Sequence, residues 1–346
     1  MKIIHLNWGN KMTTKKRIKK TTILLIVLDF FAIVCLFLMY GPFSYFRDLW
    51  VTSAMTTKSH KYLARTFFND KTINKITSGN YVKASGESTD ASVIEVGNIK
   101  ESDTYDSIYE EQILKKDEGN DLYKIIEVSG SNYKGYMAVI YDPSRISLAP
   151  AKRFGRGGEP IDQIIKNNDA ILGINANGFS DGRSVGKGSI PCGNVIKDGK
   201  AIWTTGSKGN FIGFTNDNIL MLYSGTPEEA ISKGMRDAVE FGPYLIVNGK
   251  PAEVKGNGGW GIAPRTAIAQ RKDGIVLLLV VDGRSSSSVG VDMQELINIF
   301  TRYNAYNAAN LDGGGSSILY ENGKIINNVS TLRYLPTAWI VKQLRN

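Results

Sequence analysis

The fold is decided by one stretch, residues 266–282, which reads TAIAQRKDGIVLLLVVD. Lys-Asp-Gly at 272–274 is a strong hairpin signal between two strand candidates, residues 266–270 and 274–281. The run 275–281 is apolar without alternation, as in a strand whose two faces are both covered by other parts of the protein. The sequence therefore predicts an antiparallel sheet that is covered on both faces at this strand.

Strands dominate the chain after residue 121, with a few helices between them. Asp142-Pro143 is a turn signal that ends one strand, and Thr226 begins a helix with a capping box. Further strands are predicted at residues 134–142, 170–175, 316–320 and 325–328, and helices at residues 159–167, 227–234 and 292–303. The fold class expected from this pattern is α+β, with mostly antiparallel twisted sheets and a few packed helices.

One long apolar segment precedes this region: residues 21–40 read TTILLIVLDFFAIVCLFLMY. Its length is about the 20 residues that a membrane-spanning helix requires. Asp29 near its middle costs roughly 2.5–3.5 kcal/mol on insertion, which the many Leu, Ile and Phe residues offset. A cleaved signal peptide is the alternative, but its apolar region is usually only about 7–15 residues long and ends in a small-residue cleavage site. We therefore expect one N-terminal transmembrane helix, retained as an anchor.

Charge is distributed unevenly between this N-terminal region and the rest of the chain. Residues 1–40 hold seven of the 42 basic residues and one of the 33 acidic residues, which leaves 35 against 32, a net charge of +3. Basic residues before an apolar span predict a cytoplasmic N-terminus and an extracytoplasmic domain on a single-pass protein of the cell membrane. The near-balanced remainder lacks the basic surface that nucleic-acid binding requires, so we expect no nucleic-acid partner. The expected parts are a cytoplasmic basic segment (1–20), the anchor (21–40), a juxtamembrane stem and linker (41–120) and a globular domain (121–346).

Histidine and cysteine are nearly absent from the expected domain. The two histidines, His5 and His60, both precede it, and Cys192 is its single cysteine. No Ser-His-Asp triad, Cys-His pair or histidine-rich zinc site can therefore form there, and Cys192 is expected to be a buried structural thiol. No G-x-x-x-x-G-K-[ST] motif occurs, which excludes a P-loop nucleotide site. The chemistry is left to carboxylates, Arg, Asn, Ser, Tyr and backbone N–H groups.

The most specific motif is the run 310–317, Asn-Leu-Asp-Gly-Gly-Gly-Ser-Ser, in which Asp312 precedes the glycines. Three successive glycines cost the folded chain considerable backbone entropy, so a structural need must impose them. Glycine lets backbone N–H groups converge on an anion, and it lets a ligand approach the main chain closely. A flexible turn is the alternative, but a turn needs one or two glycines rather than three followed by two serines. We therefore interpret the run as a binding site.

Three shorter motifs begin or end strands. They are Asn-Ala-Asn-Gly-Phe at 175–179, Pro-Arg-Thr-Ala at 264–267 and Val-Asp-Gly-Arg at 281–284. Amides can hydrogen-bond sugar hydroxyls or phosphate, and Arg is suited to bidentate phosphate recognition. Taken alone, each motif is also compatible with an ordinary surface feature: an Asn-Gly turn, an arginine at the start of a strand, and an Asp-Gly turn.

Together and in this order, the four motifs resemble the phosphodiester glycosidase family. The resemblance covers about residues 125–343 and includes Phe-Gly-Pro at 241–243, Asn-Gly-Lys at 248–250 and Arg-Tyr-Leu-Pro at 333–336. The family includes enzymes that remove N-acetylglucosamine from a phosphodiester and many bacterial proteins described as exopolysaccharide-related. One departure is Ser180, which stands where many relatives have Phe and bears on the expected sugar pocket.

The resemblance implies a substrate in which a sugar is linked through C1 to a phosphate that carries a second ester. Breaking the C1–O bond releases a phosphomonoester, whose second pKa is about 6, so the leaving group needs less protonation than an alcohol. The site then needs cations and N–H donors for the phosphate and a carboxylate on the sugar side. On this interpretation Asp312 and Asp282 are the catalytic acids, with Asp312 preferred. The expected substrate-binding residues are Arg265 and Arg284 at the phosphate with Gly313, Gly314 and Gly315, Asn175 and Asn177 at the sugar, and in addition Gly178, Thr266, Ser316, Ser317 and Arg333.

No cofactor is expected, although Asp312 and Asp282 leave room for a divalent ion. The expected partners are a sugar-phosphate diester or cell-surface polysaccharide as substrate, and the membrane through residues 21–40. Two other functions use the same residues. A non-catalytic module would bind a phosphate-bearing cell-wall polysaccharide without turnover, and a phosphodiesterase would attack phosphorus and release sugar-1-phosphate.

Overall fold

The computed structural model describes residues 20–57, 60–86, 88–97, 99, 104–181, 186–329 and 331–343. The chain divides into two compact units, Met1–Arg47 and Asp48–Asn346. The expected cytoplasmic basic segment, residues 1–20, lies outside the described residues except for Lys20. The second unit carries every candidate site residue of the sequence.

The first unit contains helix α1 (Lys20–Tyr40), which is 21 residues long and has no buried residue. At 1.5 Å per residue, a helix of this length spans about 30 Å, the thickness of the hydrocarbon core of a membrane. The helix predicted from the apolar segment is therefore confirmed. Its length and composition are those of a membrane-spanning helix or of a signal sequence near an N-terminus.

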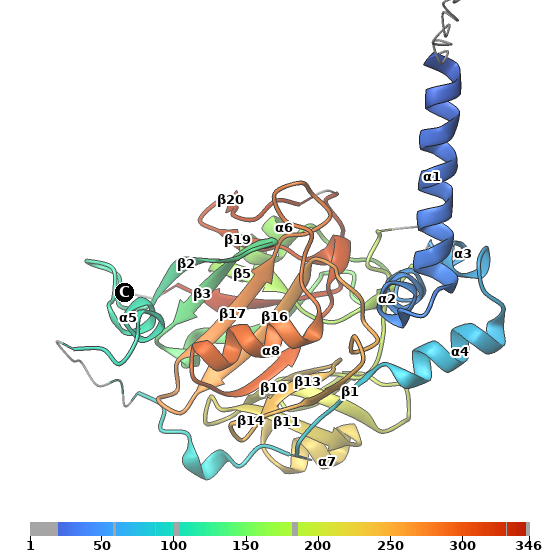
Figure 1. Ribbon diagram of the computed structural model, residues 1–346. Coiled ribbons are helices and arrows are strands. Elements are labelled where there is room, and N and C mark those ends of the chain that lie inside the picture. The colour runs from blue at the N-terminus through green and yellow to red at the C-terminus, as the bar shows by residue number, and fades with distance from the viewer. Residues whose placement is uncertain are drawn as a thin grey trace, which may run out of the picture. The chain divides into compact units, whose positions relative to one another are not determined.

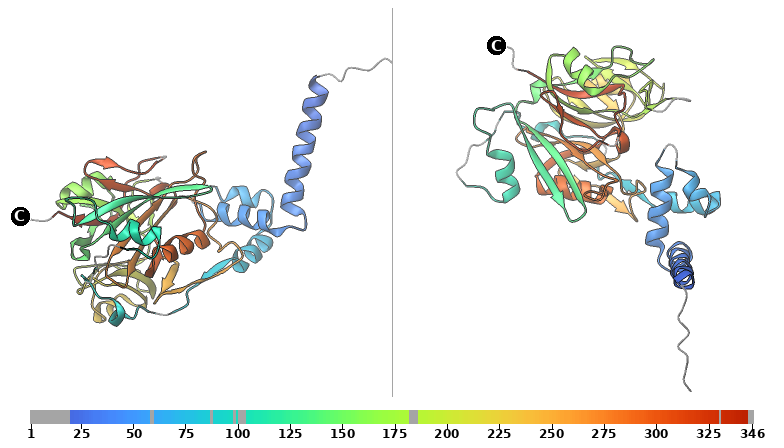
Figure 2. Two further views of the ribbon diagram at one scale, coloured as in Figure 1. Left: turned by 60° about the vertical axis from the view of Figure 1, so that its left-hand side comes forward. Right: turned by 90° about the horizontal axis from the view of Figure 1, so that it is seen from above.

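The second unit is built around a seven-stranded antiparallel sheet with the strand order β14-β13-β18-β16-β17-β3-β2. Strands β16 (Arg265–Arg271) and β17 (Val276–Val281) pair along their whole length near its middle, so the predicted hairpin is confirmed. Hairpin β2–β3 forms one edge of the sheet (Figure 2). The other strands of this sheet are β2 (Tyr123–Gly130), β3 (Tyr133–Ile140), β13 (Tyr244–Val247), β14 (Lys250–Pro251) and β18 (Ala305–Asn310).

Strand β17 is buried on both of its faces. Alternate residues from Val276 to Val280 face a core that three sheets share. The residues between them, from Leu277 to Val281, pack against helix α8 (Met293–Arg302). Figure 1 shows α8 lying across the sheet in front of β16 and β17. Both the doubly covered strand and the helix predicted after it are therefore confirmed.

Two five-stranded sheets and two two-stranded sheets complete the second unit; one of the small sheets pairs β6 (Phe179–Ser180) with β7 (Ile190–Pro191). One five-stranded sheet has the order β20-β19-β5-β21-β4, with β4 (Ile146–Pro150), β5 (Ala170–Asn175), β19 (Leu319–Glu321), β20 (Lys324–Ile325) and β21 (Thr337–Lys342). The other has the order β11-β10-β12-β8-β9, with β8 (Val195–Lys197), β9 (Lys200–Trp203), β10 (Gly209–Thr215), β11 (Leu220–Gly225) and β12 (Met235–Glu240). The first packs against helix α6 (Ile161–Asn167) and the second against helix α7 (Pro227–Ser232). The expected α+β class with mostly antiparallel sheets is confirmed.

The second unit begins well before the expected start of the domain. Strand β1 (Tyr81–Lys83) pairs with β15 (Glu253–Lys255), and the Val51 side chain is fully buried. The expected stem and linker, residues 41–120, is therefore corrected, because from residue 48 onward this segment is part of the folded domain. Its helices are α2 (Ser44–Met55), α3 (Tyr62–Arg65), α4 (Asp70–Gly79) and α5 (Ile108–Leu114).

Residues 84–107, a part of the expected stem and linker that is rich in Ser, Asp, Glu and Gly, are attached to the domain by hydrogen bonds where they are described. Thr89 N donates to Leu222 O at 3.0 Å, and Leu222 N donates to the Thr89 hydroxyl at 2.9 Å. Asp90 N donates to Asn248 Oδ1 at 2.7 Å. Ile94 adds one buried apolar contact, with Ile219 and Tyr306, but an isolated contact gives no hydrophobic periodicity, so the sequence of the segment is typical of a linker.

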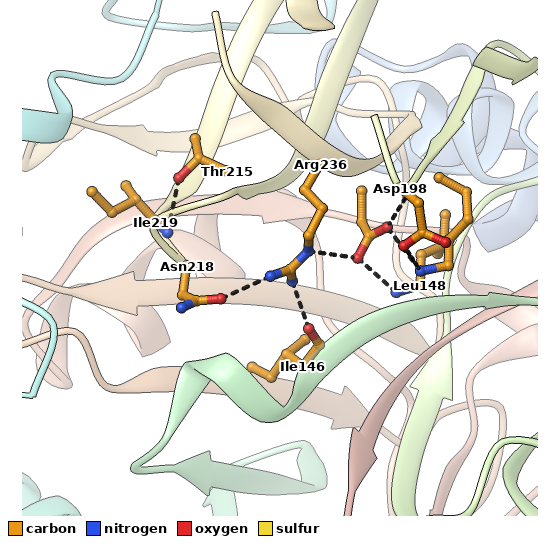
Figure 3. A network of polar contacts seen from close by, with 9 residues as sticks. Ile146, Leu148, Asp198, Thr215, Asn218, Ile219 and Arg236 are labelled. Carbon is orange, nitrogen blue, oxygen red and sulfur yellow. Dashed lines mark hydrogen bonds and ion pairs between the residues drawn. The ribbon is translucent and has the colours of Figure 1, made fainter. Parts of the chain in front are cut away.

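Two neighbouring residues of β12, Arg236 and Asp237, connect the two five-stranded sheets (Figure 3). Arg236 donates from Nη2 to Ile146 O of β4 at 2.7 Å. The Asp237 carboxylate is fully buried and accepts from Arg236 Nε at 3.0 Å and from Lys197 Nζ at 3.1 Å. This network fixes β12, whose last residue is Glu240.

We expect Asp237→Asn to lower the free energy of unfolding by about 3–5 kcal/mol, because removing one partner of a buried ion pair leaves the others uncompensated. Urea unfolding of the full chain in detergent, followed by circular dichroism, measures the loss. Asp198→Asn is the matched control, since Asp198 contacts Lys197 at 2.6 Å but its side chain is 73% exposed. This control should cost less than about 1 kcal/mol. Equal losses in the two variants would contradict the role of the buried network.

Candidate active site

The four sequence motifs meet at one edge of the second unit, where strands of two sheets begin or end. Asp312 N, just after β18, donates to Ala176 O, just after β5, at 3.2 Å. Gly314 N donates to Pro264 O, just before β16, at 2.8 Å. The glycine run therefore contacts the motifs at 175–179 and 264–267 through the backbone.

The three glycines leave room for close neighbours. A Cβ atom added at Gly313 would lie 3.0 Å from Pro264 O. One at Gly314, whose φ is +62°, would lie 3.4 Å from Arg284 Nη2, and one at Gly315 would lie 2.9 Å from Arg333 Nε. Gly313 is favoured by the nearby Pro264 carbonyl and Gly314 by its positive φ, and the missing side chains leave the main chain open to two guanidinium groups.

The guanidinium groups of Arg284 and Arg333 both lie at residues 313–315, which we call the glycine segment. Neither guanidinium forms an ion pair with a carboxylate in the part of the chain that the structure describes. Desolvation lowers the pKa of Arg284, and the charge of Arg333 lowers it further. Two like charges held together in this way favour a bound anion, which relieves their repulsion.

Arg265, expected at the phosphate, holds a neighbouring loop instead. Its side chain is buried, and Nη2 donates to the carbonyls of Trp260 and Gly261 at 2.8 and 2.6 Å. Burial lowers the pKa of Arg265 to about 10; Asp292 opposes the shift and Arg284 adds to it. The structure therefore gives Arg265 a positioning role for the loop, with its charge close to that of Arg284.

The two candidate acids occupy different environments. Asp312 is half-buried at the rim of the glycine segment. Asp282 is buried, and its Oδ1 accepts from Asn328 N at 2.9 Å and from Asn327 Nδ2 at 3.1 Å. Burial raises the pKa of Asp282, and these two hydrogen bonds oppose the increase. Because Asn327 also donates to Ser317 O at 3.1 Å, Asp282 supports the glycine segment from inside, and Asp312 is the acid at its surface.

Asn175 fixes the position of Asp312. Its side chain is buried, and Oδ1 accepts from Thr266 Oγ1 at 2.8 Å and from Ile318 N at 3.2 Å. Its Nδ2 donates to Asp312 O at 2.6 Å. Asn175 and the fully buried Thr266 were both expected at the substrate. In the structure, their hydrogen bonds join strands β5 and β16 to the segment from Asp312 to Ile318.

Four other predicted substrate-binding residues line the interior of this region. Asn177 is buried, accepts from the Thr337 hydroxyl and donates to Gly178 O at 2.9 Å. Ser316 and Ser317 are 2% and 3% exposed, and their hydroxyls have no hydrogen-bond partner among the described residues. These side chains therefore shape the site from within, and the contact of Asn177 with sugar stays a prediction.

Within the described residues, no group of three His, Cys, Asp or Glu side chains is arranged to hold a metal ion. The site as described consists of two surface arginines, a half-buried aspartate and glycine backbone. Such an arrangement can bind a phosphate group and present a carboxylate next to it.

A cleft of about 550 Å³ beside the glycine segment escaped the sequence analysis. Its wall is bonded to the strand that carries Asp312, since Asn310 Nδ2 donates to Gly242 O at 2.9 Å. Cys192 lines the cleft and is exposed, which corrects the expectation of a buried thiol. The lining residues come from five distant segments, namely residues 80–82, 192–193, 210, 240–243 and 258–260. No local motif unites them, so only their meeting in space reveals the cleft.

Comparisons with known proteins agree with this architecture. The phosphodiester glycosidase family model matches residues 168–342. The catalytic domain of zebrafish N-acetylglucosamine-1-phosphodiester alpha-N-acetylglucosaminidase, in a structure where its pro-peptide auto-inhibits it, has a TM-score of 0.56 and 19% identity. That match covers 66% of this chain and 86% of the zebrafish chain, so the two share a fold.

Two curated relatives are similar in sequence. The SPbeta prophage-derived uncharacterized protein YomE of Bacillus subtilis (strain 168) is 34% identical over 179 residues, which is 50% of this chain and 27% of that protein. The N-acetylglucosamine-1-phosphodiester alpha-N-acetylglucosaminidase of Bos taurus is 26% identical over 151 residues, which is 38% of this chain and 28% of that protein. The matched segments thus span little more than a quarter of these relatives.

Proposed function

Because this chain belongs to the phosphodiester glycosidase family, we propose that it hydrolyses the bond between sugar C1 and the oxygen of a phosphodiester, of the N-acetylglucosamine-1-phosphodiester type. Family membership supports a glycosidase-type, hydrolytic activity. One observation carries the finer proposal. Arg284 and Arg333, which have no acidic partner among the described residues, approach Gly314 and Gly315, two and three residues after Asp312 in the chain.

The leaving group explains why this set of residues suffices. Cleavage at C1 transfers the bonding electron pair to the bridging oxygen and releases a phosphomonoester with a second pKa of about 6. A leaving group of this acidity needs charge stabilisation more than it needs a proton. Arg284 and Arg333 supply that stabilisation, because they lie where the negative charge grows.

Asp312 acts on the sugar side of the bond. A carboxylate there stabilises the positive charge that develops at C1, and it serves either as a nucleophile or as a base for water. The hydrogen bonds of Asn175 and the support from Asp282 hold the segment in place, so the acid stays fixed next to the arginines.

The products of one reaction test the proposal. The full chain in detergent is incubated with a methyl diester of N-acetylglucosamine-1-phosphate, and the products are separated by chromatography. We expect free N-acetylglucosamine and methyl phosphate. N-acetylglucosamine-1-phosphate would mean attack at phosphorus, and absence of turnover with measurable binding would mean a non-catalytic module.

We place this activity outside the cytoplasm, on the substrates that cell-surface glycopolymers or exopolysaccharides provide. Support comes from α1, which is long and apolar enough to span a membrane, and from the basic residues before it. A membrane-impermeant thiol reagent should label the exposed Cys192 in intact cells. Labelling that appears only after lysis would contradict this orientation.

A further inference from the structure

The cleft beside the glycine segment is lined by groups of complementary kinds. The rings of Phe241 and Trp260 lie 6.2 Å apart at 51°, and Tyr81 adds a third aromatic side chain from the N-terminal segment. Glu240 brings a carboxylate to the lining, and Asn80 and Asn210 bring side-chain amides. Aromatic faces with a few fixed polar groups are typical of pockets that bind a ligand that is apolar on its faces and polar at its edges.

The position of the Glu240 carboxylate is fixed by neighbouring residues. Asn194, itself fully buried, donates to Glu240 Oε2 from its backbone N at 2.8 Å and from Nδ2 at 2.7 Å. A Cβ atom at Gly193 would lie 2.8 Å from Glu240 Cβ, and one at Gly209 would overlap its carboxyl group. Thr205 N fixes Asn194 in turn, with a hydrogen bond of 2.7 Å to Oδ1.

The second carboxylate oxygen of Glu240 remains available to a ligand. Among the described residues, Oε1 accepts no hydrogen bond, and no Lys or Arg forms an ion pair with Glu240. A carboxylate held by neutral donors at one oxygen, with the other facing a cleft, accepts hydrogen bonds from hydroxyl or N–H groups.

The cleft and the site of Arg284 and Arg333 differ in charge. Among the described residues no lysine or arginine lines it, so it offers no cationic side chain to a phosphate, and its carboxylate repels anionic sugars. The arginines at Gly314 and Gly315 have the opposite preference. A substrate in which a neutral sugar is linked through C1 to a phosphate matches this difference in charge.

The N-terminal segment completes the cleft. Residues 80–82 form one wall, and Asn80 is anchored because its Oδ1 accepts from Asn257 N at 2.8 Å. The backbone of Gly259, with φ of +77°, lies so close to Asn80 O that a Cβ would overlap it. A segment that precedes the family-matched residues 168–342 and a loop inside them thus form this wall together.

We propose that this cleft is the subsite for a neutral, hydroxyl-rich pyranose, in which Glu240 accepts hydrogen bonds from the sugar and Trp260 packs against its face. This inference rests on the proposed function, since it assigns the sugar half of that substrate. It makes Glu240 and Trp260 substrate-binding residues and gives the segment 80–82 a part in specificity.

Cys192 provides a direct probe, because it is exposed and lines the same cleft. In a Cys35→Ser background it is the single cysteine of the chain. The alkylation rate of Cys192 is measured on the full chain in detergent at increasing concentrations of N-acetylglucosamine. We expect the sugar to slow alkylation, and glucuronate, an anionic pyranose, to do so only at higher concentration. Alkylation that N-acetylglucosamine leaves unchanged would overturn the proposal.

Glu240→Gln then tests the carboxylate itself. Gln still accepts from Asn194, but it forms weaker hydrogen bonds with the sugar, so the protecting concentration of N-acetylglucosamine should rise about tenfold or more. The difference between the protecting concentrations of glucuronate and N-acetylglucosamine should become smaller in the same variant. A purely structural role for Glu240 would not produce this change. Trp260→Leu should weaken protection independently, whereas Glu228→Gln, on helix α7, should behave as the parent protein. An unchanged protecting concentration in Glu240→Gln would contradict the assignment.

The failure of this inference is distinguishable from that of the proposed function. Turnover of the diester with unchanged KM in Glu240→Gln would contradict the proposed subsite but not the proposed activity. Protection of Cys192 by N-acetylglucosamine without any turnover of the diester would support the proposed subsite and contradict the proposed activity.

Discussion

Asp312→Asn is expected to reduce hydrolysis of a sugar-1-phosphodiester by about 10³-fold. Asn keeps the shape and the backbone contacts of Asp312, including the bond from Asn175, but it has no negative charge to stabilise C1 and no basic oxygen. The loss should appear in kcat with little change in KM, because the charge acts mainly in the transition state. Initial rates of free N-acetylglucosamine release measure it.

Asp282→Asn is the comparison for this experiment. Asp282 is buried and accepts hydrogen bonds from Asn327 and Asn328, so its effect on turnover passes through the shape of the glycine segment and should be smaller than that of Asp312→Asn. Turnover in Asp312→Asn that equals the parent rate, with an unchanged melting temperature, would remove Asp312 from the chemistry.

The second large effect is expected from the surface arginines. Arg284→Met should lower kcat/KM by about 10–100-fold, because a charge-assisted hydrogen bond to phosphate contributes about 1.5–3 kcal/mol. Arg333→Met should act in the same direction, and the double variant should lose inhibition by inorganic phosphate. Steady-state kinetics with and without phosphate measure both quantities.

A surface arginine away from the glycine segment controls for net charge. Arg145→Met removes an arginine that pairs with Asp142 just before β4, at the opposite end of that strand from Pro150, and should change kcat/KM and phosphate inhibition less than twofold. If Arg284→Met and Arg333→Met both kept phosphate inhibition at the parent level, the anion site would lie elsewhere.

Local patterns were sufficient to predict the elements that depend on local chemistry. The hairpin of β16 and β17 follows from a Lys-Asp-Gly turn between apolar runs, and α8 follows from a capped amphipathic repeat. The glycine run was also interpretable as a site, because three glycines in a row indicate a main chain that other groups approach closely, and here these groups are the Pro264 carbonyl, Arg284 and Arg333.

The roles of individual side chains depend on burial, which short motifs do not encode. Arg265 and Arg284 both belong to motifs at strand ends, yet the first is enclosed by backbone carbonyls and the second is exposed at the glycine segment. Asn175 and Asn177 have amides suited to a sugar, but the protein itself satisfies them.

The cleft could not be predicted because it exists only through long-range contacts. Glu240 is an unremarkable acid in the sequence, and its significance comes from Asn194 and from the space left by two glycines. The N-terminal wall escaped for a related reason. Its strand β1 is three residues long, too short to show an alternation of apolar residues, and Asn80 is attached by a polar contact with Asn257.

The bond that breaks is the central claim, and hydrolysis in water enriched in oxygen-18 tests it most directly. Phosphate oxygens do not exchange with water under these conditions, so 31P NMR of the released methyl phosphate records where the water oxygen went. Cleavage between C1 and oxygen predicts methyl phosphate without the label. Label in the phosphate would show attack at phosphorus and would contradict the glycosidase chemistry assigned to Asp312, Arg284 and Arg333.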